Sequence, residues 1–179
     1  MNHADHVNLL RDGISQQGGT WADLGAGTGA FTLALAELVG ASAEIYAIDR
    51  DGGVLKQQER AMRDLFPAAK VHYRTADFTH PLDLPPLDGV VMANSLHFHR
   101  QKNPILQLVH GYLKPGGRLL LVEYDVDSGN FAVPQPLSYP TWAALAKQNG
   151  FQETRLLASR PSRFLKAIYS AVSLKDVKG

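Results

Sequence analysis

Three glycines near the start of the chain form the pattern with the clearest chemical meaning. In the stretch WADLGAGTGAFT, Gly25, Gly27 and Gly29 alternate with other residues. Asp23 precedes the first glycine by two positions, and Ala30 stands where a dinucleotide-binding G-x-G-x-x-G pattern has its third glycine. Alanine is tolerated at that position. The glycines therefore predict a turn that a ligand approaches closely, and their spacing leaves the choice of ligand open.

Asp23 discriminates between the ligands that such a turn can hold. Pyrophosphate binds at a helix N-terminus through backbone N–H groups and the positive end of the helix dipole. A carboxylate two residues upstream would repel pyrophosphate and attract an ammonium group. S-adenosylmethionine carries an ammonium group at its methionine end, together with an adenosine and a sulfonium. The acid therefore favours S-adenosylmethionine over a nicotinamide dinucleotide.

Two later aspartates extend this interpretation. Asp49 follows Gly29 by about 20 residues at the end of a predicted strand, where an acid can accept both ribose hydroxyls. Asp77, at the end of the next predicted strand, can accept from the amine of adenine, with Phe78 against the purine. Each has a simpler alternative: Asp49 as a helix N-cap, Asp77 in an Asx turn and Phe78 as a core residue.

Strands and helices are expected to alternate along the chain. Periodicity and turn residues predict strands at 20–24, 44–48, 70–75, 90–93 and 118–124, and helices at 3–17, 30–39, 54–66, 104–113 and 141–149. In the fourth of these helices, Asn103 is the expected N-cap and Pro104 the first residue.

Two final strands, 151–158 and 164–172, are joined by a short turn and must be antiparallel, because a parallel pair needs a long crossover. The pattern predicts a doubly wound α/β sheet with one reversed strand. In such a sheet, ligands bind outside the carboxyl ends of the strands.

Motifs in a fixed order identify a family. DLGAGTG, then Asp49, ADF, LDGVVMANSLHF and LKPGGRLLLVEYD, together resemble the class I S-adenosylmethionine-dependent methyltransferases, in particular the small-molecule branch of ubiquinone/menaquinone-biosynthesis-type enzymes. The resemblance covers roughly Gly19 to Val172 and implies a Rossmann-like seven-stranded sheet of order 3-2-1-4-5-7-6 with strand 7 antiparallel. It implies one domain, 1–179, with an N-terminal helix 3–17, a cofactor-binding core 19–125, and a substrate-side loop and hairpin 126–179.

The resemblance also assigns the cofactor S-adenosylmethionine to particular residues. By the family pattern, the methionine end binds Asp23 and the glycine loop, the ribose binds the end of the second strand, the adenine binds the end of the third, and the sulfonium lies after the fourth. The residues implied are Asp23, Gly25, Ala26, Gly27, Gly29, Asp49, Arg50, Asp77, Phe78, Asn94 and Ser95.

One departure from the family pattern follows the second strand. The run DRDGGVL has Asp51 where the family has a serine, and Val54-Leu55 where it has a Met-Leu pair. Gly52-Gly53 should loosen the start of the helix, since each glycine costs about 1 kcal/mol relative to alanine.

Four side chains are candidates for the acceptor side of the reaction: His97, His99, Tyr124 and Asp125. The two histidines share a face in a strand but not in a helix, and no third ligand is near, so no metal site is expected. Each can act as a base or bind substrate, or only line the pocket or the surface. Methyl transfer depends mainly on alignment, so no catalytic base is required by the chemistry alone.

Two groups of charged residues outside these motifs are interpreted as surface. His3 and His6 on the first helix either cover the cofactor or form a solvated face. Arg155, Arg160 and Arg163 near the final hairpin are expected to be solvated charges, with contact to an acidic substrate or RNA as the alternative.

Composition limits the function classes. The chain has 179 residues, 45% hydrophobic and 20% charged, with a net charge of +1, so no global field favours nucleic acid or a membrane. It has no cysteine, which excludes disulfides and cysteine nucleophiles, and neither a signal peptide nor a long apolar run is recognised. We expect a cytoplasmic methyltransferase that acts on an O, N or C nucleophile of a small molecule. A tRNA or protein methyltransferase and a nicotinamide-dependent oxidoreductase are the alternatives; the sequence makes no prediction of oligomeric state.

Overall fold

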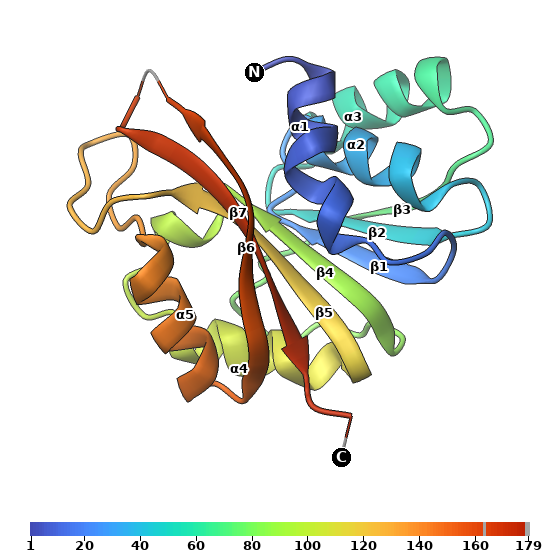
Figure 1. Cartoon of the computed structure of the whole chain (residues 1–179). Helices are drawn as coiled ribbons and strands as arrows, with labels where there is room; N and C mark the ends of the chain where they lie inside the picture. Colours follow the sequence, from blue (N-terminus) through green and yellow to red (C-terminus); the bar gives the residue numbers. More distant parts are fainter. Residues whose placement is uncertain (163, 178–179) are drawn as a thin grey trace.

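A mixed seven-stranded sheet runs through the molecule (Figure 1). The computed structural model describes residues 1–162 and 164–177. The strands are β1 Thr20–Leu24, β2 Glu44–Asp49, β3 Lys70–Thr75, β4 Leu87–Ala93, β5 Leu113–Tyr124, β6 Phe151–Pro161 and β7 Ala167–Lys175. Their order is β3-β2-β1-β4-β5-β7-β6; β1 to β5 pair in parallel, and β7 is antiparallel to β5 and β6. The predicted fold and strand order are confirmed.

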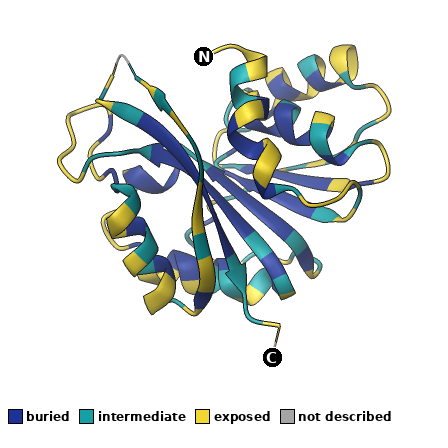
Figure 2. Ribbon diagram, viewed as in Figure 1, coloured by how far each residue is buried: buried dark blue, intermediate teal, exposed yellow. Residues whose placement is uncertain are grey.

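Helices cover both faces of the sheet. Three lie on one face and two on the other: α1 His3–Leu10, α2 Ala30–Val39 and α3 Gly52–Leu65, then α4 Asn103–Tyr112 and α5 Tyr139–Gln148 (Figure 1). In β5, Leu120 and Val122 face the first group, whereas Leu119 and Leu121 face the second. The central strands are therefore buried on both sides, as Figure 2 shows.

The N-terminal helix is shorter than the predicted span 3–17. α1 ends at Leu10, and a 3₁₀ turn, Arg11–Gly13, follows it. The carbonyl oxygens of Asp12 and Gly13 accept hydrogen bonds from Arg155 (2.7 Å) and Arg118 (2.9 Å), which lie on β6 and β5. Arginines from the sheet thus donate to carbonyls that, in a longer helix, would accept from backbone N–H groups of the next turn.

The arginines near the hairpin, predicted as solvated charges, also have partners in the protein, although Arg155 is exposed as predicted. Arg155 binds the turn after α1, and Arg160 forms an ion pair with Asp5 in α1. Arg163 lies outside the described residues. The two described arginines therefore attach the N-terminal helix to the edge strand β6.

Two strands begin earlier than predicted. β4 starts at Leu87 instead of position 90, and β5 starts at Leu113, so the LKPGG segment belongs to β5 and not to a helix end. Leu87 pairs with Leu113 and Gly89 pairs with Arg118, so the residues between the two β5 positions bulge out of the ladder. This irregular pairing obscured the start of the strand in the sequence.

Other boundaries shift because a different residue caps the helix. α3 starts at Gly52, since Asp51 is its N-cap and accepts from Gly53 N at 2.7 Å. Lys102, and not the predicted Asn103, occupies the N-cap position of α4. Ser138 caps α5, which therefore starts before the predicted position 141. In the final hairpin, β6 runs to Pro161, beyond the predicted end at position 158. β7 runs from Ala167 to Lys175, so both of its ends lie later than the predicted 164 and 172.

In the part of the chain that the structure describes, no helix combines the length and the apolar character needed to span a membrane.

Gly89 offers a test of the packing between β4 and β1. A Cβ atom at Gly89 would lie 2.2 Å from the ring of Trp21, so Gly89→Ala should lower the free energy of unfolding by about 1–3 kcal/mol through overpacking. Gly111→Ala in α4 is the matched control, because no atom lies within 4 Å of its added Cβ. It should raise stability by about 0.5–1 kcal/mol, since alanine favours the helix. Urea denaturation measures both; equal stability of Gly89→Ala and the parent would contradict the packing argument.

Candidate active site

A cavity of about 630 Å³ opens at the carboxyl ends of the parallel strands. It contains most of the residues predicted to bind the cofactor, although they come from four separate segments. Its lining consists of Gly25, Gly27, Asp49, Arg50, Ala76, Asp77, Phe78, Asn94, Ser95, Phe98 and His99.

A second hollow of about 240 Å³ adjoins the first and shares Gly25, Gly27 and Asn94 with it. Asp23 lies in the wall of this second hollow, so the two together place acids at both sides of the glycine loop. Its remaining lining residues are Met1, His6, Ala26, Thr28, Ala30, Phe31 and Ala93.

At both ends of the glycine loop, the backbone has a positive φ and an added side chain would clash with a neighbour. Gly25 has a φ of 81°, and a Cβ there would lie 2.4 Å from the side chain of Ser95. Gly29, the N-cap of α2, has a φ of 93°, and its Cβ would lie 2.4 Å from Gln58. Gly27 instead has open space where a side chain would stand. The loop is therefore packed at both ends and open in the middle, where it borders both cavities.

Asp49 holds this loop to the end of β2. Its Oδ2 accepts from Gly27 N and its Oδ1 from Asp51 N, both at 2.9 Å. Asp51, and not Asp49, is the N-cap of α3, so the simple capping alternative for Asp49 does not hold. A carboxylate has about four lone-pair sites, so Asp49 keeps capacity for hydroxyl donors from the cavity.

Asp23 is a carboxylate in a nearly dry position. Its exposed fraction is 1%, and its Oδ2 accepts from the hydroxyl of Thr32 at 2.6 Å. Burial raises the pKa of Asp23 to about 7, the hydrogen bond from Thr32 opposes this shift, and the charge of Asp49 adds to it. A cation arriving in the smaller hollow would supply the compensation that the carboxylate lacks.

Asn94 adds an unsatisfied acceptor between the two cavities. Its φ is 53°, which is uncommon for a residue other than glycine. Its Oδ1 is buried, and none of the described protein atoms donates to it. Buried polar atoms are nearly always paired in native proteins, so this oxygen at the wall of both cavities is available to a donor from a ligand. Ser95, the next residue, uses its hydroxyl to bind Leu24 O at 2.8 Å.

Asp77 and Phe78 each have a role in the local structure and also border the large cavity. Asp77 Oδ1 accepts from the backbone N–H and the hydroxyl of Thr79, which forms the Asx turn considered above. These bonds lower the pKa of Asp77 and keep it ionised. Phe78 is 9% exposed, packs in the core and meets the His99 ring edge-on at 5.1 Å. Both still border the large cavity.

The four acceptor-side candidates differ in whether they border the cavity. Of the four, His99 lines the large cavity, and burial lowers its pKa. His97 is 2% exposed and lies behind the cavity wall. Tyr124 and Asp125 line neither hollow, and Asp125 accepts from Tyr139 N at 2.9 Å. The residue that the sequence interpretation missed is Glu123, whose Oε1 lies 2.9 Å from His97 Nδ1. An acid inside the apolar run RLLLVEY was the available signal.

The histidines of α1 also separate. His6 lines the smaller hollow and packs against Phe31 with ring centres 4.8 Å apart. Burial lowers the pKa of His6, which favours its neutral form. His3 instead bonds Glu37 at the surface. Of the two histidines, His6 therefore borders a cavity, whereas His3 pairs with a residue of α2 at the surface.

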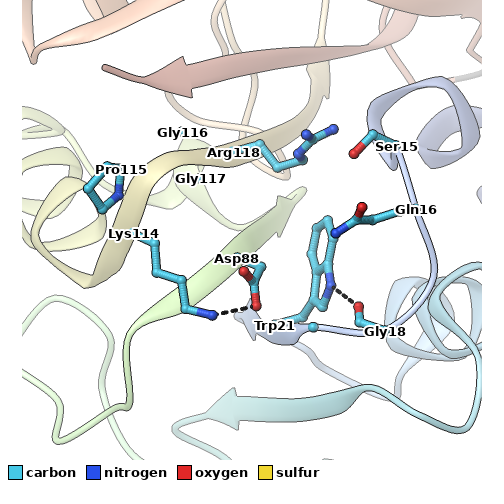
Figure 3. Close-up of a pocket in the computed structure, with 11 residues that line it drawn as sticks. Ser15, Gln16, Gly18, Trp21, Asp88, Lys114, Pro115, Gly116, Gly117 and Arg118 are labelled. Atoms are coloured by element: carbon cyan, nitrogen blue, oxygen red, sulfur yellow. Dashed lines mark hydrogen bonds and ion pairs between the residues drawn. The ribbon is translucent and has the colours of Figure 1, made fainter. Parts of the chain in front are cut away.

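A third hollow, of about 160 Å³, lies at the opposite edge of the sheet, where β1 and β4 begin (Figure 3). Lys114 Nζ donates to Asp88 Oδ2 at 2.8 Å, and Thr20 N donates to the same oxygen at 2.7 Å. Arg118 bonds the carbonyl oxygen of Gly13. Lys114 and Asp88 pair with each other and Arg118 binds a carbonyl oxygen, at the amino ends of the strands and away from the two hollows that border the glycine loop.

The sheet order and the acids at the ends of β1, β2 and β3 define a class I S-adenosylmethionine-dependent methyltransferase. The family model for a methyltransferase domain matches residues 15–158. The chain therefore belongs to the methyltransferase domain family, and S-adenosylmethionine is its cofactor. The enzyme class and the cofactor expected from the sequence are confirmed.

Curated relatives indicate the branch. The chain is 33% identical over 105 residues to the ubiquinone/menaquinone biosynthesis C-methyltransferase UbiE of Pasteurella multocida, covering 58% of this chain and 39% of the relative. It is 32% identical over 115 residues to the same enzyme of Azotobacter vinelandii, covering 63% and 45%. The matched region spans less than half the length of these relatives.

Solved structures show the same fold. A SAM-dependent methyltransferase of Aquifex aeolicus has a TM-score of 0.74 at 19% identity, covering 95% of this chain and 89% of its own. The phosphoethanolamine N-methyltransferase 2 of Haemonchus contortus, solved with S-adenosylhomocysteine, has a TM-score of 0.77 at 15% identity, covering 97% and 52%.

Asp23 makes stability and cofactor binding depend on pH. Its pKa of about 7 exceeds its ordinary value of 3.8, so the folded protein binds more protons and loses stability as the pH rises from about 4 to about 7. Asp23→Asn should reduce this loss in melting curves recorded across that range. Its affinity for S-adenosylhomocysteine should also fall, because the ionised carboxylate attracts the ammonium group. Exposed Asp64 provides the control, Asp64→Asn; an unchanged pH dependence in Asp23→Asn would contradict this account.

Asp49 and Asp51 separate ligand binding from helix capping. Asp49→Ala should weaken S-adenosylhomocysteine binding by about 10–100-fold, because one charge-assisted hydrogen bond contributes about 1.5–3 kcal/mol. Asp51→Ala should lower the free energy of unfolding by about 1 kcal/mol through loss of the N-cap and leave binding intact. Calorimetric titration and urea denaturation measure the two effects. Equal affinity of Asp49→Ala and the parent would show that Asp49 only orders the loop.

Proposed function

We propose that the protein transfers a methyl group from S-adenosylmethionine to a carbon atom of a small aromatic acceptor of the quinol type. The observation that carries the proposal is the pair of adjoining cavities with Asp23 and Asp49 on either side of the open glycine, Gly27. The nature of the acceptor is suggested by the similarity to C-methyltransferases of ubiquinone and menaquinone biosynthesis.

The donor set suits the three parts of the cofactor. We assign the methionine ammonium to Asp23 and the orphaned Oδ1 of Asn94, in or beside the smaller hollow. The ribose hydroxyls are assigned to Asp49, with Arg50 beside it, and the adenine to the walls made by Asp77 and Phe78 in the larger hollow. Gly27 allows the ligand to pass along the backbone between the two spaces.

The chain contributes alignment rather than a complex catalytic apparatus. S-adenosylmethionine supplies a methyl group activated by its sulfonium, and holding it in line with a nucleophile lowers the barrier substantially. Carbon of a phenolic ring becomes nucleophilic when the ring hydroxyl loses its proton, so this acceptor requires a base. That requirement distinguishes a ring carbon from a soft nucleophile such as a thiolate.

The charge and the rim of the site favour a small, apolar acceptor over nucleic acid. The net charge of +1 provides little general attraction for RNA. Phe98, which borders the large cavity, is 61% exposed and offers a ring for stacking. A cytoplasmic location stays a prediction from the sequence.

Calorimetry followed by turnover tests the proposal. S-adenosylhomocysteine should bind and NAD should not; heat with NAD alone would assign the protein to the oxidoreductases. Methyl-labelled S-adenosylmethionine is then incubated with a phenol, a demethylated benzoquinol and naphthoquinol, an amine and bulk tRNA. Label in the quinols at carbon supports the proposal. Label only in tRNA, or binding without transfer to any acceptor, would contradict it.

A further inference from the structure

A buried histidine–carboxylate pair lies behind the cofactor cavity. The His97 and Glu123 side chains are 3% and 0% exposed, and Nδ1 of His97 lies 2.9 Å and 3.1 Å from the two carboxylate oxygens. Tyr124 N also donates to Glu123 Oε1, at 2.8 Å. We propose that His97 is the base that takes the proton of the acceptor and that Glu123 is the positioning residue that orients it. This inference rests on the proposed function.

The hydrogen bonds determine which nitrogen can act. A carboxylate only accepts, so Nδ1 carries the proton of a neutral imidazole and Nε2 keeps its lone pair. Within the described part of the chain, the hydrogen bonds of the His97 ring are made by Nδ1, and Nε2 is left for another partner. Glu123 therefore selects the tautomer in which Nε2 can receive a proton, and its charge stabilises the imidazolium formed when it does.

Stability alone does not account for this pair. Burying a carboxylate and its partner is often less favourable than burying apolar side chains of similar volume. Glu123 follows an apolar run in β5, and three other titratable groups feel its charge: Lys102, Tyr124 and Tyr169. Burial raises the pKa of Tyr169 and the charge of Glu123 adds to this shift, so the phenol stays neutral. Retaining a buried charge at this depth beside a ligand cavity is typical of functional sites.

His97 lies next to residues of the large cavity without lining the cavity itself. It lies in the 3₁₀ turn Leu96–Phe98, between Ser95 and Phe98, which both line the large cavity. Its ring centre is 4.3 Å from that of Phe98 and 6.0 Å from that of Tyr124. Gln135 N donates to His97 O at 3.0 Å, so the segment between β5 and α5 crosses the turn.

The proposal requires the acceptor to reach Nε2 from the side of Phe98, the neighbour of His97 that borders the large cavity, where the segment between β5 and α5 crosses the turn. Phe98 is 61% exposed, and Phe131 in the same segment is fully exposed. The exposed ring of Phe98, beside His97, suits an aromatic acceptor, in agreement with the proposed acceptor class.

The step balances without a further reactant. The acceptor hydroxyl gives its proton to Nε2, and the ring carbon beside it forms a bond to the methyl carbon. The methyl–sulfur bond breaks with its electron pair staying on sulfur, which loses its positive charge. The methylated ring carbon then loses its hydrogen as a proton to water, which restores the aromatic ring, and Nε2 releases its proton to solvent.

Nitrogen NMR tests the orienting contact without any acceptor. The ¹⁵N shifts of the histidine rings are recorded with S-adenosylhomocysteine bound, at a pH where the rings are neutral. His97 should carry its proton on Nδ1 in the parent and shift toward the Nε2–H tautomer in Glu123→Leu, which offers no acceptor. An Nε2–H tautomer in the parent would overturn the proposal, whatever the substrate is.

Kinetics with a quinol that passes the labelling test provide the second arm. His97→Gln should lower kcat about 100-fold and remove the acidic limb of the pH profile, while affinity for S-adenosylhomocysteine stays within about twofold. Glu123→Gln keeps the hydrogen bond but loses the charge and should lower kcat about tenfold. His72→Gln, on exposed β3, is the matched control and should behave as the parent.

The variants also distinguish a base from a structural pair. Because His97→Gln leaves a buried carboxylate, the double variant His97→Gln/Glu123→Gln is made as well, and binding of S-adenosylhomocysteine reports that it is folded. A normal kcat in His97→Gln or in the double variant would overturn the role of His97. A kcat that falls together with the affinity for S-adenosylhomocysteine would overturn it as well. If the parent methylates no quinol, the proposed function fails, and the tautomer measurement still decides whether Glu123 orients His97.

Discussion

The reversal of strand order between β1 and β4 is the constraint on which the site depends. From β1 the chain winds outward through β2 and β3, and from β4 it winds the other way through β5. The connections that leave β1 and β4 therefore diverge, and the crevice between them cannot be filled by either. The glycine loop and Asn94 stand on its two sides, so the topology itself brings Gly25 against Ser95.

Two carboxylates are buried near this crevice, in a core that is otherwise largely apolar. Asp23 and Glu123 are 1% and 0% exposed, on strands whose other residues are largely apolar. Asp23 has one hydroxyl partner and a raised pKa, so it is prepared for a cation from outside the protein. Glu123 already has a partner inside the protein, the imidazole of His97. The first acid suits recognition of a charged ligand, and the second suits control of a neighbouring side chain.

Local patterns predicted those parts of the structure that depend on nearby residues. Alternation, turn residues and glycine spacing were sufficient for β1, β3 and α2, whose bounds match the expectation. Some boundaries were wrong because distant groups contribute to them: Arg118 and Arg155 bind carbonyls of the 3₁₀ turn that follows α1, and the bulged pairing with β4 extends β5 backward. Long-range partners leave little trace in a short window of sequence.

The sequence by itself determined the fold class, the family and the cofactor, because local periodicity indicates the alternating elements, and the acid–glycine loop and the order of the motifs carry the resemblance that implies the strand order. Only the tertiary structure decided which candidates share a site. It placed His99 in the cavity wall, tied Asp125 to Tyr139, and gave His97 the partner Glu123. These outcomes depend on which way each side chain points and on strands separated by many residues, and residue type cannot encode that direction.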